Sequence, residues 1–487
     1  MENLTKSKIY RRKAILAQTF LTTAALLVTA NNGMTAGYSA LLLPQIQAEN
    51  STLPTTEEQG SWIASIHSIV TPMGSLLSGP LMERFGRRTT LLFSLVPSLL
   101  GWMAIYMSKT HAVLLIGRCF TAITTGLSAP PALVLLAETA EPKLRGFLVG
   151  APSTSFSIGI LMIYVLNSLL PWQMVALVAA TVPFMAFASF FVLPESPLWL
   201  AKANRNNEAA SSLTWLRGGD AGKARQELEL MELQQQQNKM RQEAGTNKTS
   251  TSPLLSQPIL RALMVVNVFN FFQVMAGTFT IIFYAVSVLQ QATGGQATDT
   301  EIAVFTALSR VVLTSIACFM LLKIGRRPMT ISSGIGSGAA ALILSFWLLW
   351  MPEMEKLAWV PAVLIIIYVI FNSYGFFMIQ GLMIGEMFPA RARGPASGVT
   401  CAAINVLLFL TSKTYPWMTH ALKPAGLFLL FGLMTVAGTL FAYFFMPETK
   451  GKTLAEIEEY FNGPSVFWKK RNVDEIIKGE ENVALKP

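Results

Sequence analysis

The chain reads Gly86-Arg87-Arg88 and, in its second half, Gly325-Arg326-Arg327. Two more short motifs occur twice, in the same order. Glu138 followed by Arg145-Gly146 corresponds to Glu386 followed by Arg393-Gly394, and Pro194-Glu195-Ser196 corresponds to Pro447-Glu448-Thr449. Because the separation between the copies is nearly constant, the sequence predicts two structurally similar halves.

The composition and the apolar runs are those of a membrane protein. Of the 487 residues, 52% are hydrophobic and 13% are charged. About 20 apolar residues cross a bilayer core of roughly 30 Å, and in lipid the backbone hydrogen bonds must close within each span, so each span is a helix. We predict an all-α protein with twelve transmembrane helices at about residues 17–43, 61–82, 89–108, 112–137, 146–167, 172–193, 262–286, 302–322, 329–351, 360–387, 396–420 and 424–446.

Basic residues predict the orientation of these spans. The segment before the first span carries Lys6, Lys8, Arg11, Arg12 and Lys13, and the Gly-Arg-Arg turns are basic as well. By the positive-inside rule, both termini and all duplicated motifs are cytoplasmic. These charges account for the net charge of +10, so no nucleic-acid partner is expected. We expect a multi-pass protein of the plasma membrane.

The predicted organisation has five parts. They are a cytoplasmic N-terminus at 1–13, an N-terminal six-helix bundle at 14–195, a cytoplasmic helical linker at 196–258, a C-terminal six-helix bundle at 259–450 and a cytoplasmic tail at 451–487. The linker is either a helical cap packed against the spans or a solvated tether. Asn50 begins a glycosylation sequon in a predicted outer loop, so a glycan is expected there.

Each duplicated motif falls at a predicted cytoplasmic helix end, where charges can pair. Glu–Arg pairs at these ends would hold the helices in one state of a two-state equilibrium. The simpler alternative is positive-inside anchoring, and the duplication favours the gating interpretation. The candidate gating network consists of Arg87, Arg88, Glu138, Arg145, Arg326, Arg327, Glu386 and Arg393.

These motifs resemble those of the sugar porter family of the major facilitator superfamily. The matching stretches are Arg84 to Arg88, Gly117-Arg118, Glu138 to Gly146, Pro194 to Leu200, Gly325 to Arg327, Glu386 to Gly394 and Pro447 to Gly451. Gln59-Gly60-Ser61-Trp62 and Pro152 are similar to the insect facilitated trehalose transporter branch. The resemblance covers about residues 14–460. It implies twelve helices in two six-helix bundles related by an internal repeat, with a solute held between them and exposed alternately to each side.

The resemblance also locates the sugar-contacting positions, and this chain departs from the family there. In span 7, Gln273 and Gly277 keep the family residues, whereas Val274 and Phe279 replace a Gln and an Asn. Arg310 stands where span 8 of the family has an Asn. Span 10 lacks the usual two prolines and tryptophan in the segment from Gly375 to Gly381.

Lost amides weaken the usual sugar contacts, because a buried hydroxyl without a partner costs about 1–3 kcal/mol. A replacement set of polar side chains is available in the same spans. The candidate substrate-binding residues are Gln273, Arg310, Ser153, Thr278, Thr280, Asn372, Gln380 and Asn405. The alternative for each polar residue is helix–helix hydrogen bonding, which is common in membranes.

Arg310 lies near the predicted membrane midplane, where a charge is costly and usually faces a cavity or a partner. One hypothesis is that it favours an acidic or electron-rich solute. The other is that it is a structural strut bonded to backbone carbonyls.

The sequence gives no carrier for proton coupling. In proton-driven family members an Asp follows the Gly-Tyr or Gly-Phe of span 1, whereas here Gly37-Tyr38 is followed by Ser39. We therefore expect facilitated diffusion of a sugar such as trehalose or a hexose. The alternatives are a carrier of a non-sugar or anionic solute read by Arg310, and a solute sensor that no longer cycles. No nucleotide-binding or nucleophilic pattern is present, so we expect no enzyme activity, no cofactor, no metal and no obligate protein partner.

Overall fold

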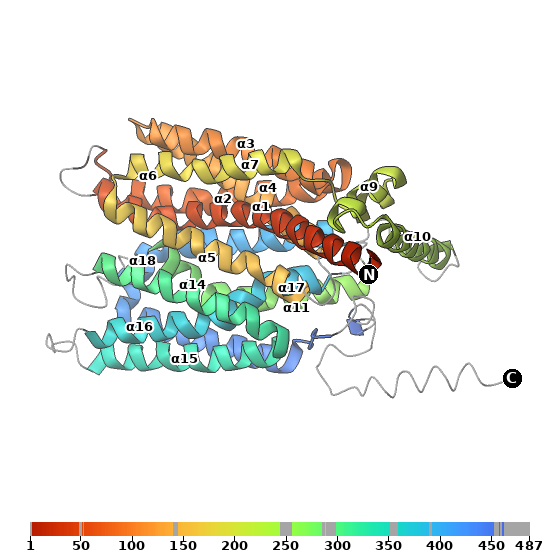
Figure 1. Cartoon of the computed structure of the whole chain (residues 1–487). Coiled ribbons are helices and arrows are strands. Elements are labelled where there is room, and N and C mark those ends of the chain that lie inside the picture. Colours follow the sequence, from red (N-terminus) through yellow and green to blue (C-terminus); the bar gives the residue numbers. More distant parts are fainter. Residues whose placement is uncertain are drawn as a thin grey trace.

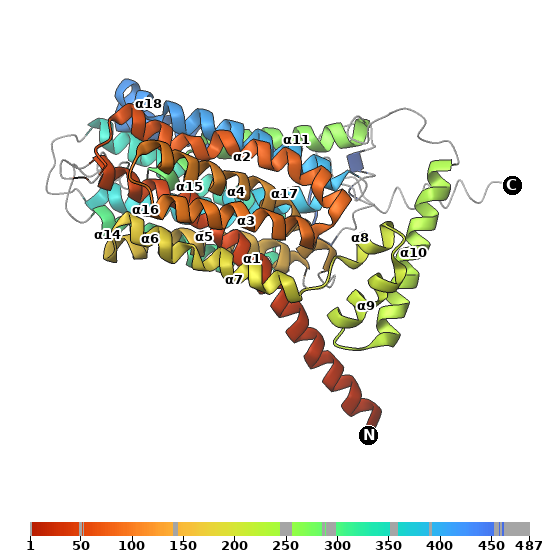
Figure 2. The same cartoon turned by 90° about the horizontal axis from the view of Figure 1, so that it is seen from above.

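The computed structural model describes residues 2–47, 51, 53–139, 145–243, 256–284, 288, 299–350, 359–388, 392–451, 457 and 460–461, and most of them are helical. Figure 1 shows two groups of long, roughly parallel helices, one built from each half of the chain. At one end, a group of shorter helices and the N-terminal end of α1 extend beyond the long helices (Figure 2). The predicted all-α fold is confirmed.

The N-terminal half contains seven helices. They are α1 (Glu2–Gln47), α2 (Glu57–Phe85), α3 (Arg87–Tyr106), α4 (His111–Thr139), α5 (Arg145–Leu169), α6 (Trp172–Ala179) and α7 (Thr181–Val192). The sixth predicted span is divided into α6 and α7 at Ala180. Pro183 explains the interruption, because proline has no N–H to donate to the preceding helical turn.

The C-terminal half repeats this order with local breaks. Its elements are α11 (Gln257–Met275), α12 (Thr278–Phe283), α14 (Asp299–Lys323), α15 (Arg326–Trp350), α16 (Trp359–Asn372), the π-helical turn η3 (Ser373–Phe377), α17 (Met378–Glu386) and α18 (Arg393–Phe445). The predicted seventh span breaks at Gly277, where φ is +84°. The predicted tenth span continues through η3 with helical backbone angles at Asn372, Phe377 and Met378.

Within the described part of the chain, ten helices are long and apolar enough to cross a membrane. One of them, 394–445, contains both the eleventh and twelfth predicted spans, which meet at Lys423, where φ is 56°. The residue before a proline is disfavoured in the α conformation, and Pro424 follows. α2 is not among the ten, and it carries several buried polar residues, such as Ser65, His67 and Ser75. The count of twelve spans stays a prediction consistent with these helices.

A helical linker packs at the end of the bundle where the duplicated motifs lie, which we call the motif end. It comprises α8 (Pro197–Lys202), α9 (Asn206–Leu216) and α10 (Ala221–Glu243). The indole N–H of Trp199 donates to the carbonyl of Glu83 at 2.8 Å, which ties α8 to the end of α2. α9 contacts α1 beside this point.

The two halves touch at both ends of the bundle. Toward the motif end, a Cβ on Gly398 would lie 2.8 Å from the carbonyl oxygen of Ser75, so α18 and α2 approach closely there. At the opposite end, Lys413 Nζ donates to Ser61 Oγ at 2.8 Å. Small residues allow such close helix approach in membranes.

Candidate functional site

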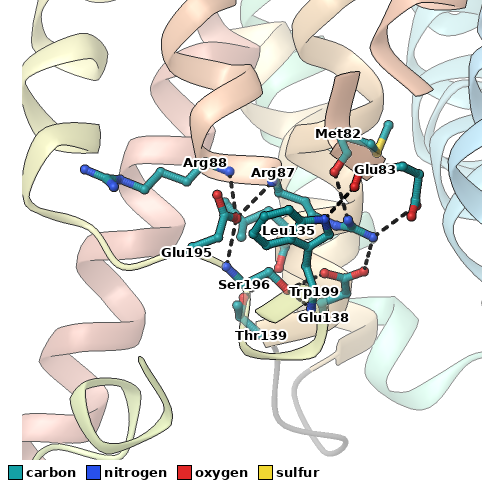
Figure 3. Close-up of polar contacts among 10 residues, drawn as sticks. All are labelled: Met82, Glu83, Arg87, Arg88, Leu135, Glu138, Thr139, Glu195, Ser196 and Trp199. Atoms are coloured by element: carbon teal, nitrogen blue, oxygen red, sulfur yellow. Dashed lines mark hydrogen bonds and ion pairs between the residues drawn. The ribbon is translucent and has the colours of Figure 1, made fainter. Parts of the chain in front are cut away.

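A buried charge network occupies the motif end of the N-terminal half (Figure 3). Arg87 begins α3 and Glu138 lies at the end of α4, with 3.0 Å between Arg87 Nη2 and Glu138 Oε1. Arg87 Nη1 donates to the carbonyl of Met82 at 3.0 Å, and the hydroxyl of Ser196 donates to Glu138 Oε2. Charge-assisted bonds of this kind are about twice as strong as neutral ones, so the network fastens α3, α4 and the start of α8 together.

The C-terminal half contains the equivalent network. Arg326 binds Glu386 with two nitrogens, at 2.8 Å from Nη2 to Oε1 and 3.2 Å from Nε to Oε2. Arg326 Nη1 donates to the carbonyl of Leu321, as Arg87 does to Met82. Thr449 donates to Glu386 at 2.6 Å, in the position that Ser196 holds in the first half. The sequence repeat is therefore also a repeat of contacts.

Glu195 and Glu448 cap helix N-termini, a role that the sequence analysis missed. Glu195 Oε1 accepts from the backbone N–H groups of Arg87 and Arg88 at 2.8 and 3.0 Å. Glu448 accepts from the backbone N–H groups of Arg326 and Arg327 at 3.0 and 3.1 Å. A carboxylate satisfies the free N–H groups at a helix start and interacts favourably with the helix dipole. The duplicated Pro-Glu-Ser and Pro-Glu-Thr triplets could have indicated this capping role from the sequence.

These carboxylates explain the glycine of each Gly-Arg-Arg motif. A Cβ on Gly86 would lie 2.3 Å from Glu195 Oε2, and a Cβ on Gly325 would lie 2.2 Å from Glu448 Oε2. Any side chain at these positions would displace the capping carboxylate.

The remaining members of the predicted gating network have different surroundings. Arg88 donates to the carbonyls of Phe190 and Phe191 at 2.7 and 2.9 Å, and Arg327 donates to the carbonyl of Tyr443. Both therefore bind the last turn of a helix, where free carbonyls attract a cation. The side chains of Arg145 and Arg393 lie outside the described residues, as does Asn50.

None of the ion pairs within the described part of the chain joins the two halves. Glu83 comes nearest to doing so. Its Oε1 lies 3.4 Å from Arg87 Nη2 and would lie 3.2 Å from a Cβ on Gly394, at the start of α18. Each network therefore links elements of one half only, and Glu83 extends the first network as far as the start of α18 in the other half.

Among the candidate substrate residues, Thr278 and Asn372 bind each other. Thr278 Oγ1 donates to Asn372 Oδ1 at 2.8 Å, and Asn372 Nδ2 donates to the hydroxyl of Tyr368 at 3.4 Å. Tyr368 in turn donates to the carbonyl of Ala276, next to the break at Gly277. This series of hydrogen bonds satisfies a backbone carbonyl beside the break in the helix. For Thr278 and Asn372 it corresponds to the alternative of helix–helix hydrogen bonding.

Gln273 has a different environment. It is completely buried, and neither its Oε1 nor its Nε2 has a hydrogen-bond partner among the described residues. Asn270, one turn earlier on the same face of α11, is 1% exposed and equally without partners. Buried polar groups are nearly always bonded, so each such exception needs an explanation. The sequence analysis named Gln273 but missed Asn270, although the spacing of three residues was visible.

Arg310 lies on α14 within an aromatic cluster between the halves. It is 4% exposed, and its guanidinium carbon lies 5.4 Å from the centre of the Phe377 ring. Phe377 lies 5.9 Å from Phe156 of α5 and 6.0 Å from Phe279. Arg310 Nη1 is buried without a hydrogen-bond partner in the described part of the chain. A cation over a ring face is stabilised, yet part of its donor capacity remains unused.

The other four candidates are dispersed. Ser153 faces α17, since a Cβ on Gly381 would lie 3.6 Å from its hydroxyl. Gln380 is buried on α17. Asn405 donates to the carbonyl of Cys401 in its own helix at 2.8 Å. Thr280 borders a small cavity within the C-terminal half, beside Thr411 and Tyr415.

Ser39 lies beside a second buried arginine. Arg118 is 0% exposed; its Nη1 donates to the carbonyl of Thr35 at 2.8 Å and its Nη2 donates to Ser39 Oγ. Among the described residues Arg118 has no carboxylate partner. The position after Gly37-Tyr38 is therefore in direct contact with a buried guanidinium.

Comparison with known proteins gives the same architecture. Among solved structures, the proton:xylose symporter XylE bound to 6-bromo-6-deoxy-D-glucose matches with a TM-score of 0.75 at 19% identity, over 91% of this chain and 99% of that one. The inward-open structure of XylE from E. coli gives a TM-score of 0.69 at 20% identity, over 91% and 99% of the two chains. At such identities the likeness concerns the fold.

Sequence relatives are more similar. The facilitated trehalose transporter Tret1 of Bombyx mori is 30% identical, over 93% of this chain and 87% of its own length. A Tret1-2 homolog of Drosophila sechellia is 31% identical, over 85% and 84%. Tret1 of Anopheles gambiae is 29% identical over 94% of this chain, which spans 57% of that relative. The model of the sugar (and other) transporter family matches residues 20–461. Because this match covers most of the chain, the chain belongs to the sugar (and other) transporter family.

Proposed function

We propose that the protein is a facilitative carrier of a sugar, such as trehalose or a hexose, that works by alternating access with an altered central pocket. The observation that carries this proposal is the pair of buried amides without partners, Asn270 and Gln273. Amide groups can both donate to and accept from sugar hydroxyls, and a bound sugar would supply the missing partners. Relatives of 30–31% identity that are named facilitated trehalose transporters support the same substrate class.

Uptake of radiolabelled solutes into proteoliposomes tests this function. The panel contains trehalose, glucose, polyols and organic acids, and empty vesicles give the background. We expect saturable uptake of one sugar that equilibrates across the membrane without an ion gradient. Binding of a sugar without net uptake would instead identify a protein that no longer cycles.

The second candidate function is transport of an anionic solute. It is favoured by Arg310 Nη1, which is buried without a partner, because a carboxylate or phosphate would bind such a group strongly. Arg310→Lys keeps the charge and Arg310→Gln removes it. If the solute is anionic, Arg310→Gln abolishes uptake and Arg310→Lys retains part of it; equal sugar uptake by both variants would exclude this role.

We also propose that the motif end faces the cytoplasm of a plasma-membrane protein, as the basic residues indicate. In this arrangement the two charge networks keep the inner end of each half rigid while the halves rock. Glu138→Gln and Glu386→Gln should then raise the accessibility of the motif end to membrane-permeant thiol reagents. Protease protection of tagged termini in intact cells tests the orientation, and unprotected tags would overturn it.

A further inference from the structure

A groove lies between the first helix and the linker, apart from the central candidates. Its α1 side is formed by Lys13, Leu16, Ala17 and Phe20, and its α9 side includes Thr214 and Trp215. The groove has a volume of about 780 Å³. Figure 2 shows this part of α1 leaving the bundle next to α9.

The walls of the groove are fixed by close contact. Gly218, which follows α9, has φ of +68°, and a Cβ there would lie 2.4 Å from both the amide nitrogen of Ala14 and the carbonyl oxygen of Tyr10. The turn after α9 thus packs directly on the backbone of α1. The four α1 residues are spaced by three and four positions, so they form one face of that helix.

The groove lies where α1 passes from a basic to an apolar stretch of sequence. Leu16 is 68% exposed and Phe20 is 39% exposed, and they begin the long apolar run of α1. Lys13 is exposed one turn before Leu16. Trp215, on the opposite wall, is half-buried. Tryptophan prefers the membrane interface, where its apolar ring and its N–H can both be satisfied.

The α1 side of the groove is basic, and the carboxylate of Asp220, which follows the groove residue Gly219, lies 3.9 Å from Lys223 Nζ. Lys13 and its neighbours Arg11 and Arg12 are exposed and form no ion pair with a described residue. On the linker side, Arg217 is already paired with Glu227 at 2.7 Å. The complementary ligand for an uncompensated basic group at the membrane surface is an anionic headgroup.

We propose that the groove between α1 and α9 binds one phospholipid with an anionic headgroup. The headgroup lies at Lys13, within reach of the Trp215 N–H, and an acyl chain follows Leu16 and Phe20 across Ala17. Binding joins the linker to the first helix, because the two walls of the groove belong to these two elements. Neither the family match nor the proposed sugar site is needed for this inference.

Thermal unfolding of the delipidated full-length protein in detergent tests the proposal. We expect short-chain phosphatidylserine to raise Tm in a concentration-dependent manner, since a ligand that binds the folded state stabilises it. Short-chain phosphatidylcholine should act much more weakly. Glycerophosphoserine, which has the headgroup without acyl chains, should give no shift.

Two variants examine the two parts of the groove. Lys13→Glu should weaken phosphatidylserine binding by at least about fivefold, since one basic residue near a membrane surface contributes about that factor. Ala17→Trp fills the apolar floor without changing the charge and should abolish the shift. Lys109→Glu, the same charge change at an exposed residue outside the groove, is the matched control and should leave the affinity unchanged.

Each contrary result overturns the proposal. An equal shift with phosphatidylcholine means general solvation by lipid. Loss of the shift in Lys13→Glu but not in Ala17→Trp means attraction to the basic segment alone, without a site in the groove. An unchanged affinity in both variants means that phosphatidylserine binds elsewhere.

Discussion

At the scale of single residues, glycine and glutamate of different motifs depend on each other. Gly86 and Gly325 leave the space in which Glu195 and Glu448 cap the next helix. Sequence inspection finds both motifs, since both are duplicated. It does not find that one fits into the other, because more than a hundred residues separate each pair and only packing brings them together.

Gly325→Ala should therefore destabilise the C-terminal half. The new methyl group displaces the Glu448 carboxylate and costs the α15 cap, which corresponds to about 0.5–2 kcal/mol. Thermal unfolding of the purified protein measures the loss. Gly222→Ala, where the nearest atom is 3.5 Å away, is the control and should be neutral or slightly stabilising. If Glu448→Ala were as destabilising on the Gly325→Ala background as in the wild type, the two residues would be independent and the explanation wrong.

Gln273 offers a test that separates binding from structure. Its amide has no hydrogen-bond partner among the described residues, so Gln273→Leu removes a buried unsatisfied group and should leave stability unchanged or raise it slightly. Sugar uptake should nevertheless fall at least about fivefold if about 1–3 kcal/mol of substrate contact is lost. Uptake and Tm are measured on the same preparation. Thr278→Val is the contrasting variant: it breaks the bond to Asn372 and should lower Tm. A fall in Tm for Gln273→Leu with normal uptake would favour a structural role.

At the scale of elements, Lys413 of α18 contacts α2 at the end opposite the motifs. Lys413 Nζ donates to Ser61 and lies 4.1 Å from the centre of the Trp62 ring. One hydrogen bond and one cation–π contact are each of the order of 1 kcal/mol. This energy is too small to hold the halves closed permanently and large enough to bias a two-state equilibrium.

Lys413→Met keeps the aliphatic stem and removes both contacts, so opening between α2 and α18 should become about fivefold more frequent or more. The measurement is the labelling rate of Ser68→Cys, which lies two turns along α2 from Ser61 and is buried, by an impermeant maleimide. The background lacks Cys119, Cys318 and Cys401. Lys109→Met is the control for charge loss. An identical labelling rate in both variants would contradict the role proposed for Lys413 in holding α2 and α18 together.

Only some of the helix breaks can be predicted from the sequence. The sequence predicts separate spans at 396–420 and 424–446, and the structure turns between them at Lys423. The break in the seventh predicted span was not foreseen. It requires Gly277 to accept a left-handed backbone beside the ring of Phe431, where a Cβ would lie 2.5 Å from a ring carbon. That contact exists only after α11 and α18 have packed.

At the scale of the whole molecule, the contact between Arg118 and Ser39 bears on whether transport can be coupled to protons. Arg118 is buried without a carboxylate partner in the described residues, and it binds the hydroxyl of Ser39. A serine does not titrate in the working range, so this pair offers no site for a driving proton. Uptake should therefore be insensitive to a protonophore at constant membrane potential.

Ser39→Asp should introduce pH dependence into uptake, because the new carboxylate would lie against the Arg118 guanidinium and change charge with pH. Uptake by proteoliposomes is measured across a pH series for the wild type, Ser39→Asp and the non-titrating control Ser39→Asn. We expect a flat profile for the wild type and the Asn variant and a sloping profile for the Asp variant. A pH-dependent wild type, inhibited by protonophore, would refute facilitated diffusion.

The membrane class, the all-helical fold, the internal repeat and the family could all be predicted from the amino-acid sequence, because hydrophobic length and short duplicated motifs are local properties of the chain. Only the tertiary structure decided which polar residues are already satisfied. Thr278 and Asn372 bind each other, whereas the side chains of Gln273 and Asn270 and one nitrogen of Arg310 have no hydrogen-bond partner in the part of the chain that the structure describes. The physical reason is that hydrogen bonding in a helix bundle depends on which faces meet across helices, and residues far apart in the chain supply those faces.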